Sequence, residues 1–119
     1  MMKTVAAALF AAALMPPHIA SAAASTSDGR VSVAQVMEMV EYAARDEKVR
    51  QIVTAYLAGI GETAGELVRR KALNCARPIT VSGDAAFAAV SAVSDRRRWA
   101  ETAATPLVVE DLLKRAGCR

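Results

Sequence analysis

The segment Asp46–Ile60, DEKVRQIVTAYLAGI, carries the strongest periodic signal in the chain. Its apolar residues return every three or four positions, as one face of a helix requires. These residues are Val49, Ile52, Val53, Tyr56, Leu57 and Ile60. Glu47 and Arg50 belong to the opposite face, and Asp46 can cap the first turn. The segment therefore predicts an amphipathic helix with one solvated face and one face turned to a core.

A helix is also predicted upstream, over residues 33–44, because Ser32 and Gln35 form a capping box in front of it. Three glycines follow the periodic segment: Gly59, Gly61 and Gly65. Each glycine inside a helix costs roughly 1 kcal/mol relative to alanine, so this stretch predicts a kink, a break or a close helix contact. A phosphate-binding glycine loop does not fit, because such a loop follows a strand. Beyond the glycines, a helical stripe resumes and is expected to reach Cys75.

Residues 76–83 are the main irregular segment, since Pro78 opposes helix formation. Ser82 can then cap a third helix. Its buried stripe is expected to be Phe87, Val90 and Val93.

A last helix is predicted to begin at Thr105–Pro106, a cap and first-turn pair, and to end before Gly117. Lys114 and Arg115 suit its last turn, where the helix dipole is negative. Together these patterns predict an all-α fold, a small bundle of four or five helices.

The first two dozen residues have the plan of a secretory signal peptide. Lys3 precedes an apolar run that Pro16–Pro17 ends, and small residues follow. The apolar run is about 11 residues long, well short of the length that spans a bilayer, so a signal peptide is favoured over a membrane anchor. Cleavage after Ala22 and cleavage after Ala24 fit the pattern equally well.

The expected segments are a signal peptide at 1–24, a flexible tail at 25–31 and a helical domain at 32–119. Secretion would place the domain in the periplasm, where disulfides form. Cys75 and Cys118 allow only one intramolecular pair. Such a disulfide would close the bundle and contribute about 4 kcal/mol to its stability. Two free buried thiols are the alternative.

Composition excludes several chemistries. The single histidine, His18, lies in the expected signal peptide, so the mature domain cannot build a Ser-His-Asp triad, a Cys-His dyad or a histidine metal site. The net charge of +3 is too small to predict nucleic-acid binding. We expect no enzyme, no cofactor and no metal, and a binding, inhibitory or chaperone role instead.

A partner-binding surface is expected in exposed, irregular segments, where arginine and tryptophan are common hot-spot residues. The candidates are Arg77, Thr80, Ser82, Arg96, Arg97, Arg98 and Trp99. The alternatives are that Arg96–Arg98 forms only a solvated basic turn and that Trp99 anchors the last helix in the core.

Several short motifs follow one another between residues 40 and 118. They are the helix AYLAGI at 55–60, Cys75 followed by RPIT at 77–80, Trp99 shortly before Ala103–Ala104, and the ending LLKRAGC at 112–118. In these motifs the chain resembles the Tai/Rap-type family of periplasmic immunity proteins, which act against type VI secretion amidases. Many members of that family have a proline beside the final cysteine, where this chain has Gly117.

The resemblance implies a small all-helical protein, often a homodimer, with one intramolecular disulfide. Such a protein binds a peptidoglycan amidase delivered into the periplasm and blocks its active cleft without any catalytic residue of its own. A small periplasmic accessory protein or an acid-stress chaperone is the alternative. We expect a protein partner, no nucleic acid and no stable membrane insertion.

Overall fold

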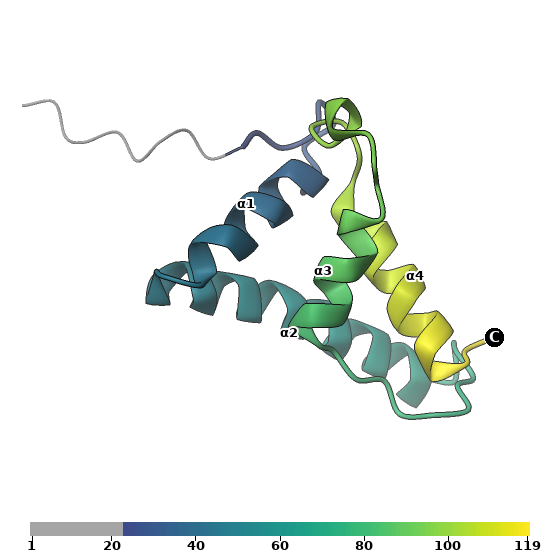
Figure 1. The fold of residues 1–119 in the computed structure, drawn as a ribbon. Coiled ribbons are helices and arrows are strands. Elements are labelled where there is room, and N and C mark those ends of the chain that lie inside the picture. Colours follow the sequence, from purple (N-terminus) through teal and green to yellow (C-terminus); the bar gives the residue numbers. More distant parts are fainter. Residues whose placement is uncertain (1–22) are drawn as a thin grey trace, which may run out of the picture.

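The computed structural model describes residues 23–119, so the predicted signal peptide lies outside the described residues except for Ala23 and Ala24. The described part contains four α-helices and one short 3-10 helix (Figure 1). They are α1 (Val33–Ala43), α2 (Glu47–Arg69), α3 (Gly83–Ser91), η1 (Arg96–Arg98) and α4 (Ala104–Ala116). Residues 23–119 contain no β-strand, only two isolated β-bridges, and the predicted all-α bundle is confirmed.

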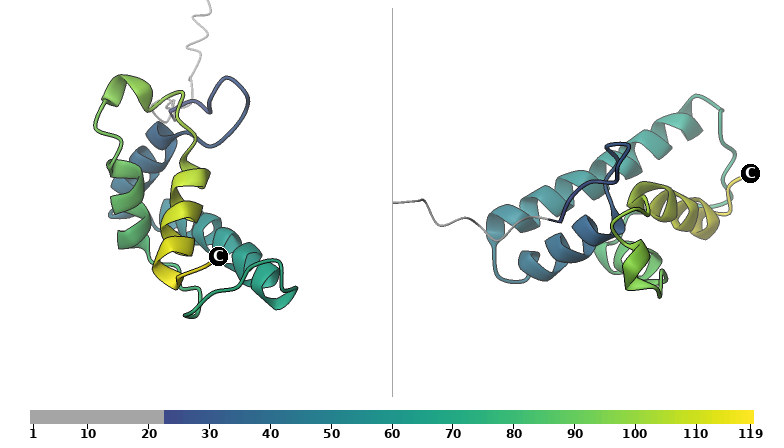
Figure 2. Two further views of the ribbon diagram at one scale, coloured as in Figure 1. Left: turned by 90° about the vertical axis from the view of Figure 1, so that its right-hand side faces the viewer. Right: turned by 90° about the horizontal axis from the view of Figure 1, so that it is seen from above.

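The helices enclose one small core. In Figure 1, α1 and α2 form a V, and the neighbouring helices α3 and α4 close its open side. Seen from above in Figure 2, α1 lies along the first part of α2, and α4 lies along the later part. The core cluster draws buried residues from all four helices: Val33, Val36, Leu57, Ala86, Val90, Ala104 and Val108. Because none of these side chains is aromatic, the core is aliphatic and thin, as expected for a chain of this size.

The first two helices begin where local chemistry predicts. Ser32 Oγ accepts the N–H of Gln35, and the side chain of Gln35 accepts the N–H of Ser32, which completes the capping box. Asp46 accepts the first free N–H groups of α2. The predicted buried face of α2 is only partly buried, because Leu57 lies in the core whereas Ile52 is 57% exposed.

The glycine-rich stretch does not break α2, which continues to Arg69. The expected break is therefore wrong. Gly61 does make a close contact, but with Val81 in the loop before α3 and not with another helix. A Cβ at this position would collide with Cγ2 of Val81, whereas Gly59 and Gly65 face open space. The expected helical stripe up to Cys75 is also wrong. The helix ends before Lys71, whose φ is +60°. The backbone N–H groups of Lys71 and Ala72 donate to carbonyls in the last turn of α2, and these bonds turn the chain away from the helix axis.

The third helix begins at the predicted cap, where Ser82 Oγ accepts the N–H of Ala85. Its predicted stripe needs correction. Val90 is fully buried, but Phe87 is 39% exposed, because Ala86 is the residue that turns to the core. Val93 lies beyond the end of α3 and packs against the core from the connecting loop.

The last helix begins at Ala104 rather than at a threonine cap, so the predicted Thr105–Pro106 cap is wrong. The N-cap residue Ala103 makes no side-chain cap bond. Instead, the N–H of Ala104 donates to the carbonyl of Val31, 2.9 Å away, and the Thr105 hydroxyl lies 2.8 Å from that of Tyr56. The predicted stop is confirmed, because Gly117 takes the left-handed conformation with φ +63°.

The segment before α1 makes defined contacts. Thr26 is buried and closes a turn with Arg30, and Ser27 donates to the carboxylate of Glu101. The segment expected to be a flexible tail, 25–31, thus contains residues with hydrogen-bond partners in the domain. Among the described residues, no helix has the length and apolar character needed to cross a membrane.

Candidate partner-binding site

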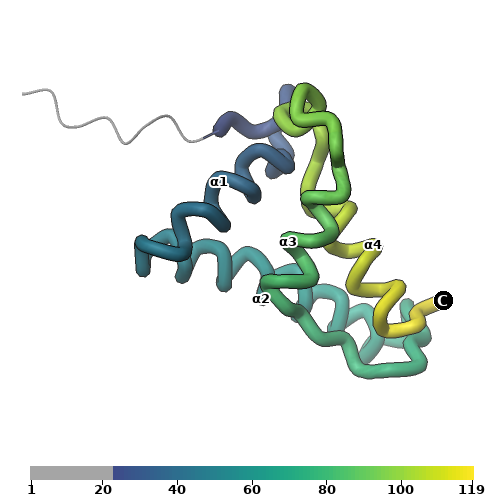
Figure 3. Tube along the Cα trace, viewed as in Figure 1, coloured from purple at the N-terminus to yellow at the C-terminus, as the bar shows by residue number. Residues whose placement is uncertain are grey.

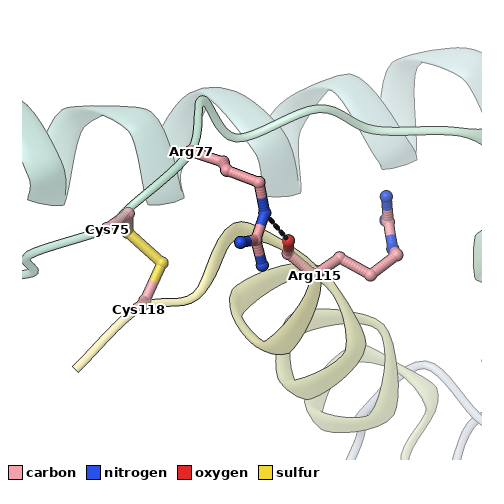
Figure 4. The surroundings of a disulfide bond; sticks show 4 residues. All are labelled: Cys75, Arg77, Arg115 and Cys118. Carbon is pink, nitrogen blue, oxygen red and sulfur yellow. Dashed lines mark hydrogen bonds between the residues drawn. A yellow bond between two sulfur atoms is a disulfide. The ribbon is translucent and has the colours of Figure 1, made fainter.

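The predicted disulfide joins Cys75 and Cys118 across 43 positions of sequence, so the alternative of two free thiols is excluded (Figure 4). It ties the segment after α2 to the residue that follows the C-terminal stop of α4. The backbones pair around it. Asn74 and Arg119 exchange two N–H···O bonds of 3.2 and 2.8 Å, and Arg77 N donates to the carbonyl of Ala116 at 3.0 Å.

Arginine side chains hold the same segment against the end of α4. Arg77 Nε donates to the carbonyl of Arg115 at 2.8 Å, as the dashed line in Figure 4 shows. The guanidinium of Arg115 reaches back to the carbonyl of Thr80 at 3.3 Å and also bonds Asp111 on its own helix at 2.8 Å. Cations therefore occupy the negative end of the α4 dipole and satisfy a terminal carbonyl.

Val81 fixes the far end of this segment by packing where α2 has no side chain at Gly61. We call residues 74–82 the clamped loop. A disulfide, backbone pairing, two arginines and Val81 hold it, yet Arg77, Pro78 and Thr80 are exposed. Ser82 is exposed too, but its hydroxyl is used to cap α3. A shallow cleft of about 390 Å³ runs between the loop and α2.

The second candidate segment is η1 with the residues around it. Arg96, Arg97 and Arg98 are exposed, and Asp95 caps them by accepting the N–H of Arg97 at 3.1 Å. The Arg97 side chain also bonds Asp95, and these bonds hold the pKa of the Asp95 carboxyl below its usual range. The ion pair is solvent-exposed, so it contributes little to stability.

Trp99 lies half-buried against the core. Its indole Nε1 donates to the carbonyl of Val93 at 2.7 Å, and its own carbonyl accepts the N–H of Ala34 at 3.2 Å. The guanidinium of Arg96 lies 5.4 Å from the ring centroid. Trp99 therefore packs against the core and links the turn at η1 to the start of α1.

The structure does not bring the seven predicted site residues together. The clamped loop leads into the start of α3 and pairs with the end of α4, whereas η1 connects the other ends of the same two helices (Figure 3). A helix of the length of α4 spans about 20 Å. Arg77, Thr80 and Ser82 therefore form one candidate surface, and Arg96–Trp99 forms another.

An apolar groove between α2 and α4 was not predicted. It has a volume of about 450 Å³, and its lining includes Leu67, Leu73 and Leu113. The Tyr56–Thr105 hydrogen bond lies at its wall, and burial raises the pKa of the Tyr56 phenol. The only sequence signal was that these leucines belong to helical stripes. Their juxtaposition depends on α2 continuing past its glycines.

Among residues 23–119, no group of three or more His, Cys, Asp or Glu side chains is placed to hold a metal ion. No family model, no curated protein and no solved structure matches this chain.

Proposed function

We propose that this is a non-catalytic periplasmic binding protein that presents the clamped loop to a protein partner. By its resemblance, the partner is a peptidoglycan amidase of type VI secretion, and the protein acts as the immunity protein that blocks its cleft. One observation carries the proposal: residues 74–82 are irregular and exposed, yet they are fixed at both ends and in the middle.

Rigidity of an exposed loop favours inhibition by occlusion. Binding costs free energy wherever flexible groups must be ordered, so a loop that is already fixed binds more tightly for the same contacts. An interface of standard size covers about 800 Å² on each partner. The clamped loop would therefore be its centre, with the adjoining ends of α2 and α4 as its rim.

The chemistry of this surface suggests an acidic partner. Arg77 uses its Nε on a carbonyl, and a guanidinium has four further N–H donors. Arg69, Arg70 and Lys71 lie at the end of α2, and Glu66 pairs with the first two of them. Lys71 precedes the loop by three positions in sequence and adds a positive charge to this end of α2. We expect association to slow as salt concentration rises, as it does when opposite charges steer an encounter.

The test is co-expression of the oxidised protein with its neighbouring gene products, followed by pull-down and a peptidoglycan hydrolysis assay. A stoichiometric complex with a cell-wall amidase and loss of its activity would support the proposal. Thr80→Glu is the loop variant of choice, because its negative charge should repel an acidic partner and the Thr80 side chain makes no hydrogen bond that holds the fold. Arg97→Ala, in the other exposed segment, is the matched control and should leave the complex intact.

A second candidate function is a small periplasmic accessory protein or acid-stress chaperone. It is favoured by the α2/α4 groove and by the exposed apolar side chains Ile52, Leu67 and Phe87. It predicts that acid loosens the bundle and increases binding of an apolar dye. Capture of a defined non-hydrolase partner would favour the accessory role. A folded, disulfide-bonded protein that binds no amidase but suppresses aggregation of acid-denatured clients would favour the chaperone.

A further inference from the structure

The residues that directly follow Ala22 make specific contacts with the first helix. The backbone nitrogen of Ala23 donates to Oε2 of Glu38 on α1. The carbonyl of Ala24 accepts a hydrogen bond of 2.8 Å from Oγ of Ser32. Ser32 is fully buried, and its Oγ also accepts the N–H of Gln35 in the capping box. Ala23 and Ala24 therefore both contact the folded domain.

We propose that the precursor is cleaved between Ala22 and Ala23, and that the new α-ammonium group of Ala23 pairs with the carboxylate of Glu38. The inference rests on the secretion proposed above, and it selects one of the two sites that the sequence leaves open. Cleavage is a hydrolysis for which a signal peptidase supplies the catalytic groups. Water adds its oxygen to the carbonyl carbon of Ala22, and the C–N bond to Ala23 breaks. Ala22 leaves as a carboxylate, and both protons of the water end on the nitrogen of Ala23, which becomes an ammonium group.

Cleavage at this bond keeps both contacts and strengthens one of them. In the precursor, the nitrogen of Ala23 is a neutral amide donor to Glu38. After cleavage, the same nitrogen is positively charged, so a Coulomb attraction between opposite charges is added to the hydrogen bond.

Cleavage after Ala24 would remove both contacts. It would delete the donor to Glu38, and it would also delete the carbonyl that accepts from Ser32. A buried hydroxyl that loses its acceptor destabilises the fold, because the group remains desolvated without a partner. Since Ser32 also caps α1, the damage would fall at the start of the first helix.

The decisive measurement is the N-terminus of the secreted protein. The full precursor is expressed in a bacterium with a periplasm, and the periplasmic protein is analysed by intact mass and N-terminal sequencing. A chain that begins at Ala23 is expected. A chain that begins at Ser25 or later overturns the cleavage site and leaves secretion standing. A periplasmic chain that retains all 119 residues overturns the cleavage itself. A full-length chain found only in the cytoplasm overturns secretion, and the inference with it.

A second measurement tests the ion pair. Glu38→Gln is introduced into the normal precursor and into a precursor that lacks Ala23 and Ala24, from which the secreted product begins at Ser25. We expect Glu38→Gln to lower the melting temperature by about 4 °C in the first protein and to have no effect in the second. Equal shifts in both proteins would overturn the ion pair.

Glu41→Gln is the matched control in both proteins. Glu41 is an exposed carboxylate on the same helix and lies 4.0 Å from Arg45 rather than near the N-terminus. Its substitution should have the same small effect whether or not Ala23 is present. An effect that depends on Ala23 as strongly as that of Glu38→Gln would also overturn the specific pairing.

Discussion

The two longest connections between helices in the described part of the chain both carry exposed arginines. In the clamped loop, Arg77 bonds a backbone carbonyl on a distant helix, 38 positions away in sequence. Around η1, Arg97 bonds Asp95, only two positions away. The first segment is held by long-range contacts and a disulfide, whereas the second is held by local bonds and by Trp99. Arg77 and Arg97, both predicted from sequence to be exposed in irregular segments, therefore have different structural roles.

The contrast bears on function. A loop held by contacts with distant elements keeps its shape when a partner arrives, so its side chains are preorganised. A short turn held by exposed ion pairs gains little from them, because water and salt screen such pairs. This difference is why the clamped loop, and not η1, is the surface we propose for the partner.

Removing the disulfide should have the largest effect on stability and on partner binding, because it anchors the clamped loop and not η1. We expect the double variant Cys75→Ala/Cys118→Ala to lose about 4 kcal/mol of unfolding free energy, since the cross-link closes a loop of 43 positions. Partner binding should weaken further, because the clamped loop loses its anchor. Urea denaturation measures the first effect and titration calorimetry the second. Wild-type protein under reducing conditions should behave alike, and unchanged binding would contradict the role of preorganisation.

Gly61→Ala should have the next largest effect. Alanine normally stabilises a helix relative to glycine by about 1 kcal/mol. Here the added Cβ would collide with Val81, and such overpacking typically costs about 1–3 kcal/mol, so we expect a net loss in urea denaturation. Gly59→Ala and Gly65→Ala are matched controls that face open space and should be neutral or stabilising. Restored stability in Gly61→Ala/Val81→Ala would confirm the contact, whereas a stabilised Gly61→Ala would contradict it.

Trp99→Phe tests the other segment. The change removes the hydrogen bond from Nε1 to the carbonyl of Val93 and leaves most of the apolar packing in place. We expect a loss of about 1 kcal/mol, measured by thermal unfolding. Partner binding should not change if the clamped loop is the interface. A large loss of binding with little loss of stability would instead move the interface to η1.

The smallest expected effect is a pH dependence at Asp95. Bonds from the Arg97 side chain and backbone hold the pKa of this carboxyl below its ordinary 3.8 in the folded protein. The ionised carboxylate therefore favours folding above pH 3.8, and this contribution is lost as the pH falls through the lowered pKa. In a plot of melting temperature against pH, Asp95→Asn should slightly reduce the decrease in melting temperature at acid pH. Identical profiles for the wild-type protein and Asp95→Asn would contradict the bond.

Local signals in the sequence predicted much of the fold. Ser32, Asp46 and Ser82 each cap the helix that their position predicts, because a cap bond involves only the next two or three residues. The prediction failed at Thr105, because the N–H of Ala104 is satisfied by Val31, a residue far away in sequence. It also failed at Phe87, since the rotation of a nine-residue helix is set by what packs against it.

The candidate site was predictable as a set of residues but not as a surface. Exposure and residue type selected Arg77, Thr80 and Ser82, together with the four residues Arg96–Trp99. Which of them lie together depends on the antiparallel course of α3 and α4, which no local pattern encodes. The close contact between Gly61 and Val81 was not predictable for the same reason, because only tertiary packing brings α2 and the clamped loop together.

The disulfide also determines how the protein carries tension. A pull on the two ends of the chain runs through α1 and α2 to Cys75, and then crosses the sulfur bridge directly to Cys118 and the terminal Arg119. The covalent ring between the two cysteines contains α3, η1 and α4, so the covalent load path bypasses these elements while the bridge is intact. Reduction would release roughly 150 Å of additional contour length under force. The intact bridge therefore keeps the ring with the clamped loop from being pulled out, and α1 and α2 lie on the covalent path.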